Sequence, residues 1–275
     1  KILEDNPREV NAGLLLGRIA IHARAFKQAE KLLKRVIKIA PKFILAWHEL
    51  SNALREQGKD EEAIELLEEA LLFDTENATT HYQLAAALAV AGRTADSASA
   101  YKKAVQIDPN LVGAYLGLGH TLKTMGDLEG GIAAYKQARK LKPNIGEISF
   151  SLSNLKTFRF SDLEIEDMKR RLNNPNLDQP SKVAFSFSLG KAYEDMKKYD
   201  EAFEFYLRGN EIHRSLVTYD PVQTEVSNEK LKEVFSKDFF DKLDSSKVGN
   251  SDPSPIFIVG MPRSGSTLLE QILAS

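Results

Sequence analysis

The sequence contains no cysteine among its 275 residues, which excludes disulfide bonds, thiolate metal ligands and a cysteine nucleophile. It also lacks an excess of charge, since the formal net charge is −2, so nothing favours nucleic acid or an anionic membrane surface as a partner. No apolar run approaches the roughly 18 residues that a membrane-spanning helix needs. We therefore expect a cytoplasmic protein with no nucleic-acid partner and no membrane segment.

Histidines are few and widely spaced. Two metal ligands share one face of a helix when they are three or four residues apart, and no pair of the five histidines has that spacing. We therefore expect no metal site. The five are His22, His48, His81, His120 and His213.

What the sequence does contain is a repeat of helix-breaking positions. Pro41, Pro109 and Pro143 each end a helical run, and Thr75 occupies the position between the first two, so that successive breaks are 34 residues apart. A period of 34 residues with two helices per unit is the signature of tetratricopeptide repeats. Residues 10–145 resemble this family, which implies an all-α, right-handed superhelix of stacked helix pairs.

The positions of the family can be matched one by one. We take the units as 10–43, 44–77, 78–111 and 112–145. Small residues stand at the eighth position of each unit, where the first helix must pack closely on the second, and a glycine follows the first helix in three units. The small residues are Gly17, Ser51, Ala85 and Gly119, and the turn glycines are Gly58, Gly92 and Gly126.

The pattern weakens after Ile145. We expect a degenerate helix pair over 146–182, whose second helix starts at Ser161 with Glu164 three residues later, a capping-box pattern. This segment has 37 residues instead of 34, so an insertion is expected to bend the superhelix there.

A regular unit is expected again over 183–216, so that about six helix pairs make up an array over 1–216. Residues 217–254 are expected to form a capping helix and a polar linker, and 255–275 the start of another domain.

The first helix of each pair is expected to line a concave groove, the usual site of peptide recognition in helical solenoids. Its fifth and ninth positions would place an apolar and aromatic stripe beside a hydrogen-bonding one, and we expect a protein or peptide there. Alternatively, these side chains cover neighbouring helices or form ordinary wet surface. One variant of the family binds a C-terminal carboxylate through a lysine at the fifth position, which is absent here. The candidate groove residues are Arg18, His48, Asn52, Tyr82, Leu116, His120, Phe150, Asn154, Phe187 and Lys191.

The last residues carry a different pattern. The apolar run from Ile256 to Val259 predicts a buried strand, followed by a loop between Gly260 and Gly265 and then a helix. Such an arrangement aims backbone N–H groups and the positive end of a helix dipole at one point, which suits a phosphate group. Ser266 stands where nucleoside triphosphatases have a lysine, which argues against ATP or GTP hydrolysis.

The loop Pro-Arg-Ser-Gly-Ser-Thr over 262–267 resembles the 5′-phosphosulfate-binding loop of sulfotransferases, and the whole layout resembles the bacterial repeat-fused sulfotransferases. The resemblance implies 3′-phosphoadenosine-5′-phosphosulfate as sulfate donor and a hydroxyl group as acceptor. It assigns a catalytic role to Arg263, which would neutralise charge on the sulfate. It also implies that the cofactor is held by Arg263, Ser264, Gly265, Ser266 and Thr267. Glu270 lies in an apolar run, and we interpret it as structural rather than as a base.

Two hypotheses follow for function. In the first, the chain is the front part of a sulfotransferase, cut before its general base, and its repeats recruit a protein acceptor. In the second, it is a non-catalytic interaction module. In either case we expect this chain to bind no cofactor and to be inactive by itself. The apolar run 256–259 further predicts a homodimer through the C-terminal segment.

Overall fold

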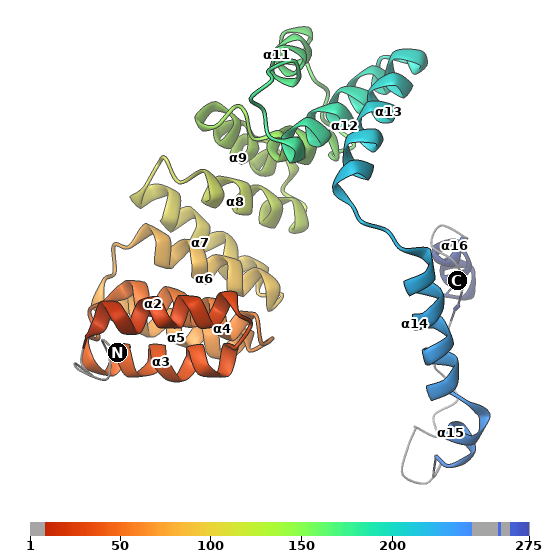
Figure 1. Ribbon diagram of the computed structural model, residues 1–275. Helices are drawn as coiled ribbons and strands as arrows, with labels where there is room; N and C mark the ends of the chain where they lie inside the picture. Colours follow the sequence, from red (N-terminus) through yellow and green to blue (C-terminus); the bar gives the residue numbers. More distant parts are fainter. Residues whose placement is uncertain (1–8, 244–257, 260–264, 275) are drawn as a thin grey trace. The chain divides into compact units, whose positions relative to one another are not determined.

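The structure is a computed structural model that describes residues 9–243, 258–259 and 265–274. These residues form α-helices joined by short turns, with no strand among them (Figure 1). The chain divides into two units, Lys1–Val217 and Thr218–Ser275. The helices of the first unit are α2 (Val10–His22), α3 (Phe26–Ile39), α4 (Ile44–Arg55), α5 (Asp60–Phe73), α6 (Ala78–Val90), α7 (Thr94–Ile107), α8 (Val112–Thr124), α9 (Leu128–Leu141), α10 (Gly146–Ser153), α11 (Asp162–Leu172), α12 (Gln179–Asp195) and α13 (Tyr199–Leu216). The second unit contains α14 (Pro221–Val234), α15 (Lys237–Asp241) and α16 (Ser266–Ala274).

The first helices of successive pairs begin at a regular interval. Helices α2, α4, α6, α8 and α10 begin 34 residues apart, at the first residue of each expected unit. Helix α12 begins at Gln179 rather than at residue 183, because Asp178 caps it: its carboxylate accepts a hydrogen bond of 2.8 Å from the backbone N–H of Ser181. Pro180, near the start of the helix, has a backbone conformation suited to that position.

The helix pairs stack into the tetratricopeptide-repeat fold that the period predicts, and Figure 1 shows α2 to α9 as consecutive antiparallel pairs. Each of α2, α4 and α6 contacts the first helix of the next pair, whereas the second helices α3, α5, α7 and α9 approach one another less closely. Helices are crowded on the inside of a curve and spread on its outside. The first helices of these pairs therefore lie on the inner side of the array.

The small residues at the eighth position of a unit let a large side chain of the second helix approach. A Cβ atom at Gly119 would lie 2.4 Å from the ring of Tyr135, which is completely buried. The same two positions pair Gly17 with Leu33 and Gly190 with Tyr206. This recurring small-to-large contact explains why the two helices of a pair lie so close.

The turn between the two helices of a pair needs a positive φ angle. Gly58, Gly92 and Gly126 adopt φ angles of 71°, 77° and 85°, as their place in the repeat predicts. In the first pair the equivalent residue is Arg24, with φ 56°, and in the last pair Lys197 has φ 61°. Two pairs therefore hold a side chain in a conformation that favours glycine.

The degenerate pair is built differently. The capping box predicted at Ser161 and Glu164 is present and starts helix α11. Helix α10 has only 8 residues and packs directly on the next first helix, α12. At their closest point the N–H of Gly146 donates to the Ser181 hydroxyl at 3.2 Å, and a Cβ atom at Gly146 would lie 2.5 Å from the Ser181 carbonyl oxygen.

The second unit contains the helix expected after residue 221, now seen as α14 and α15. The linker expected up to residue 254 lies, from 244 onward, outside the described residues, and the capping role stays a prediction. The strand expected over 256–259 is not shown, because Ile258 and Val259 have no regular secondary structure and the residues before them lie outside the described part.

Candidate functional site: the inner face of the repeats

The fifth positions of the first helices do not form one continuous exposed stripe. His48 was expected in the groove, but only 6% of it is exposed, and its Nε2 atom lies 2.8 Å from the hydroxyl oxygen of Thr80 on the next first helix. We therefore correct this prediction: His48 is an internal contact between α4 and α6 and offers little surface to a ligand. Burial lowers its pKa below the ordinary value of 6.5.

The aromatic residues at this position pack partly against other rings. Tyr82 is half-buried, and its ring centroid lies 6.1 Å from that of Tyr101. Phe150 is 38% exposed and lies 6.2 Å from Phe187, which in turn contacts Tyr206. Leu116 is half-buried beside the core cluster around Tyr135 and Ile148. The structure thus brings Phe150 and Phe187 together and leaves the face of Phe150 accessible.

The ninth positions are more open, although several side chains already have partners. Arg18 forms an ion pair of 2.7 Å with Glu49. Lys191 is paired with Asp195 one helical turn away. The amide of Asn154 is exposed and forms no hydrogen bond within the described part of the chain.

His120, the remaining polar residue of this stripe, lies at the surface with one ring nitrogen engaged. Its Nδ1 atom is 2.9 Å from the hydroxyl oxygen of the buried Tyr135. Burial lowers the pKa of His120 and raises that of Tyr135 to about 12, so both groups are neutral near pH 7. Its Nε2 atom is the part of His120 that a ligand could reach.

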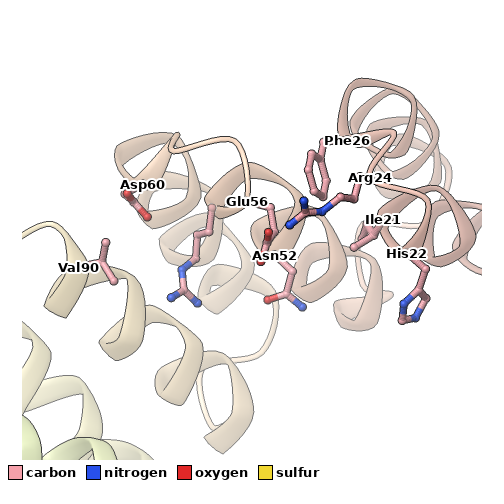
Figure 2. Close-up of a pocket in the computed structure, with 9 residues that line it drawn as sticks. Ile21, His22, Arg24, Phe26, Asn52, Glu56, Asp60 and Val90 are labelled. Atoms are coloured by element: carbon pink, nitrogen blue, oxygen red, sulfur yellow. The ribbon is translucent and has the colours of Figure 1, made fainter. Parts of the chain in front are cut away.

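A hollow of about 690 Å³ lies where three first helices end, and Asn52 from the predicted groove borders it. Figure 2 shows the residues of the first pair on one side of Asn52 and Glu56, with Asp60 and Val90 on the other. The lining residues are Ile21, His22, Arg24, Phe26, Asn52, Arg55, Glu56, Asp60 and Val90.

Sequence reasoning named only Asn52 among these residues, because it considered the fifth and ninth positions alone. Ile21 and Arg55 stand at the twelfth position of their units, and His22, Glu56 and Val90 at the thirteenth. These positions lie on the same face of an α-helix as the ninth, three or four residues further on. That spacing was the signal which could have found them.

The predicted phosphate loop is only partly described. Gly265 has a φ angle of 89°, and its carbonyl oxygen accepts a hydrogen bond from the N–H of Leu269 in the first turn of α16. Ser266 and Thr267 are the first two residues of that helix, where backbone N–H groups lack partners within the helix. Arg263 and Ser264 lie outside the described residues.

Two further site types were examined in the described residues. No group of three or more His, Asp or Glu side chains there is arranged to hold a metal ion. None of the described helices combines the length and the apolar character that crossing a membrane requires. The cytoplasmic location stays a prediction.

Comparison with known proteins supports the repeats over several segments. The family described as "TPR repeat" matches residues 51–92, and "Tetratricopeptide repeat" matches 112–145 and 184–214. The family described as "Sulfotransferase family" matches residues 255–275. The sulfotransferase match thus covers only the segment whose loop suggested it.

The chain is also similar to an uncharacterized protein of Aquifex aeolicus, with 33% identity over 121 residues. That match covers 44% of this chain but only 16% of the relative, so the chain spans a small part of that protein's length.

Among solved structures, the chain is similar to pilF of Pseudomonas aeruginosa (17% identity, 86% of this chain and 98% of that one, TM-score 0.55). It is also similar to the APC/C hetero-tetramer Cut9–Hcn1 (15% identity, 77% and 41%, TM-score 0.56). At these identities the similarity shows the fold alone, a superhelix of tetratricopeptide repeats.

Proposed function

We propose that the inner face of the repeats binds an extended peptide or a segment of a partner protein. The observation that carries this proposal is the hollow bordered by the ends of α2, α4 and α6, because it joins three successive repeats into one surface. Hydrogen-bonding groups such as the amides of Asn52 and Asn154 stand along that face, and amides suit a peptide backbone because they both donate and accept.

Selection of peptides from a random display library against the 275-residue chain tests this proposal. Selected peptides are expected to compete with one another and to bind several-fold more weakly to Asn52→Ala and Asn154→Ala. Lys102→Ala is the matched control, because Lys102 is exposed on the second helix α7. Binding that all three substitutions leave unchanged would place the peptides elsewhere.

We further propose that these repeats serve a sulfotransferase that transfers sulfate from 3′-phosphoadenosine-5′-phosphosulfate to a hydroxyl group of the bound partner. Support comes from the family match over 255–275 and from Gly265 at the start of α16, where N–H groups and the helix dipole suit a phosphate. Arg263, Ser264, Ser266 and Thr267 would hold the 5′-phosphosulfate.

Calorimetry with adenosine 3′,5′-bisphosphate tests the second proposal on the product of the complete coding frame. We expect that product to bind the nucleotide and its Arg263→Ala variant to bind at least tenfold more weakly, because charge-assisted hydrogen bonds to phosphate are strong. The 275-residue chain alone is expected not to bind. A complete product that also fails to bind would favour the non-catalytic interaction module.

A homodimer through the C-terminal segment is also proposed, on the grounds that Val259 is 94% exposed within an apolar run. Light scattering is expected to show a dimer whose mass falls to that of the monomer after Val259→Asp. A monomer at high concentration of the unmodified chain would remove this proposal.

A further inference from the structure

The hollow at the ends of α2, α4 and α6 contains a cation with no partner. The Nε atom of Arg55 is buried and forms no hydrogen bond, and no carboxylate among the described residues lies within ion-pair distance of its guanidinium group. Buried polar groups in folded proteins are almost always hydrogen-bonded. An orphaned guanidinium nitrogen that borders a hollow is therefore a donor awaiting an acceptor.

The helix end beside Arg55 needs no further donor. The carbonyl oxygens of residues 52–55, the last turn of α4, all accept hydrogen bonds from the backbone N–H groups of residues 56–59 or from the Gln57 side chain. The partial negative charge usual at a helix C-terminus is thereby partly satisfied within the chain. The unmet hydrogen-bonding capacity at this place belongs to Arg55, so the missing group is an acceptor.

A second arginine borders the hollow from the first repeat. Arg24 stands where the next three pairs have a turn glycine, and it keeps a φ angle of 56°. Its guanidinium group likewise forms no ion pair or hydrogen bond with the described residues. Figure 2 shows the Arg24 side chain on the side of the hollow formed by Ile21 and Phe26.

The charges around the hollow limit the ligand further. Arg24 and Arg55 are balanced by the carboxylates of Glu56 and Asp60, which also line it. A phosphate monoester carries a charge near −2, and the two carboxylates would repel it strongly. A single carboxylate carries −1 and can accept two parallel hydrogen bonds from one guanidinium fork.

We infer that the hollow at the ends of α2, α4 and α6 binds a carboxylate of the bound peptide through Arg55. This inference rests on the proposed peptide-binding function and names the chemistry of the ligand. The carboxylate pairs with the guanidinium group of Arg55, the Asn52 amide holds the adjacent peptide backbone, and Ile21, Phe26 and Val90 contact an apolar neighbour. The source is an internal Asp or Glu side chain or the C-terminus of the peptide.

Three immobilised peptide libraries of equal length test this assignment on the 275-residue chain. One has Asp or Glu at a central position and an amidated C-terminus, one has Asn or Gln there and an amidated C-terminus, and one has Asn or Gln with a free C-terminal carboxylate. Retention of the chain is expected to be about tenfold stronger on a carboxylate library, the effect of roughly one charge-assisted hydrogen bond. Whichever carboxylate library retains it identifies the source.

The Arg55→Met variant is expected to lose this preference and to bind all three libraries equally. Arg35→Gln is the matched control, because it removes one positive charge from an exposed position on α3. Arg55→Met is also expected to unfold at the same temperature as the unmodified chain or higher, since methionine removes a buried unpaired donor. If that variant fails to fold, Arg55→Lys, which keeps the charge without the fork, is expected to retain acidic peptides several-fold more weakly.

Equal retention on acidic and amide libraries, or an acid preference that survives in Arg55→Met and Arg55→Lys, would overturn the inference while leaving peptide binding intact. Stronger retention by a fourth library with central phosphoserine would overturn the choice of a carboxylate. Absence of retention on every library would instead contradict the proposed peptide-binding function, and the inference with it.

Discussion

The Nε2 atom of His48 lies 2.8 Å from the hydroxyl oxygen of Thr80, and this buried hydrogen bond connects helix α4 to helix α6. Only 6% of His48 and none of Thr80 is exposed. The contact joins equivalent faces of two successive repeats, so the protonation of one side chain affects the stacking of the array.

The array is expected to lose stability as the pH falls below about 6.5. Burial lowers the pKa of His48 in the folded state, whereas the unfolded chain keeps the ordinary value of 6.5, so the unfolded state binds the proton first. The stabilisation is complete above pH 6.5 and is lost as the pH falls towards the folded-state pKa. His120, whose pKa burial also lowers, adds a contribution of the same sign.

Free energies of unfolding in urea at pH 7.5, 6.5 and 5.5 check this prediction. His48→Gln should flatten the dependence, since an amide can replace the hydrogen bond and does not titrate. His213→Gln, at an exposed position of α13, should not. Carboxylates such as Glu30, whose pKa the Lys34 and Lys59 ammonium groups hold near about 2, act only below about pH 4.5 and so leave this window undisturbed. A flat profile for the unmodified chain would contradict the role given to His48.

Gly119→Ala is expected to destabilise the fold by about 1–3 kcal/mol, the usual cost of overpacking. The added Cβ atom would lie 2.4 Å from the ring of Tyr135, which is fully buried and hydrogen-bonded to His120 and so has no room to move. Gly113→Ala is the control, because its Cβ would lie 3.3 Å from the half-buried ring of Tyr82. Chemical denaturation should show that Gly113→Ala changes the stability by less than about 0.5 kcal/mol, since higher helix propensity offsets the contact. Equal effects of the two substitutions would refute this account of helix packing.

Arg24→Gly should stabilise the fold by about 0.5–1 kcal/mol. It removes the strain of a left-handed backbone, about 1–2 kcal/mol, and adds the greater freedom of glycine in the unfolded chain, about 0.4–1 kcal/mol. Lys197→Gly should stabilise the fold similarly, because Lys197 has a φ angle of 61°. The two differ in binding, since only Arg24 borders the hollow, so only Arg24→Gly should weaken retention of acidic peptides. A loss of stability in both variants would show that these side chains do more than the glycine they replace.

The regular part of the fold could be read from spacing. Break positions at Pro41, Thr75, Pro109 and Pro143 predicted where each first helix begins, and small residues such as Gly119 predicted which helices pack closely. The start of α12 could not be read in this way. A local cap at Asp178 overrides the period there, and sequence reasoning counted the period instead of looking for the cap.

The amino-acid sequence by itself determined the repeat, because a contact within one unit, such as that of Gly17 with Leu33, depends on residues at a fixed short separation. Only the tertiary structure decided which inner-face residues are free. His48 and Phe150 occupy the same position of their units, yet the first is buried against Thr80 while 38% of the second is exposed. The free donor of Arg55 was likewise decided by three helix ends that stacking brings together, and exposure depends on such neighbours from other repeats rather than on a residue's own place in the period.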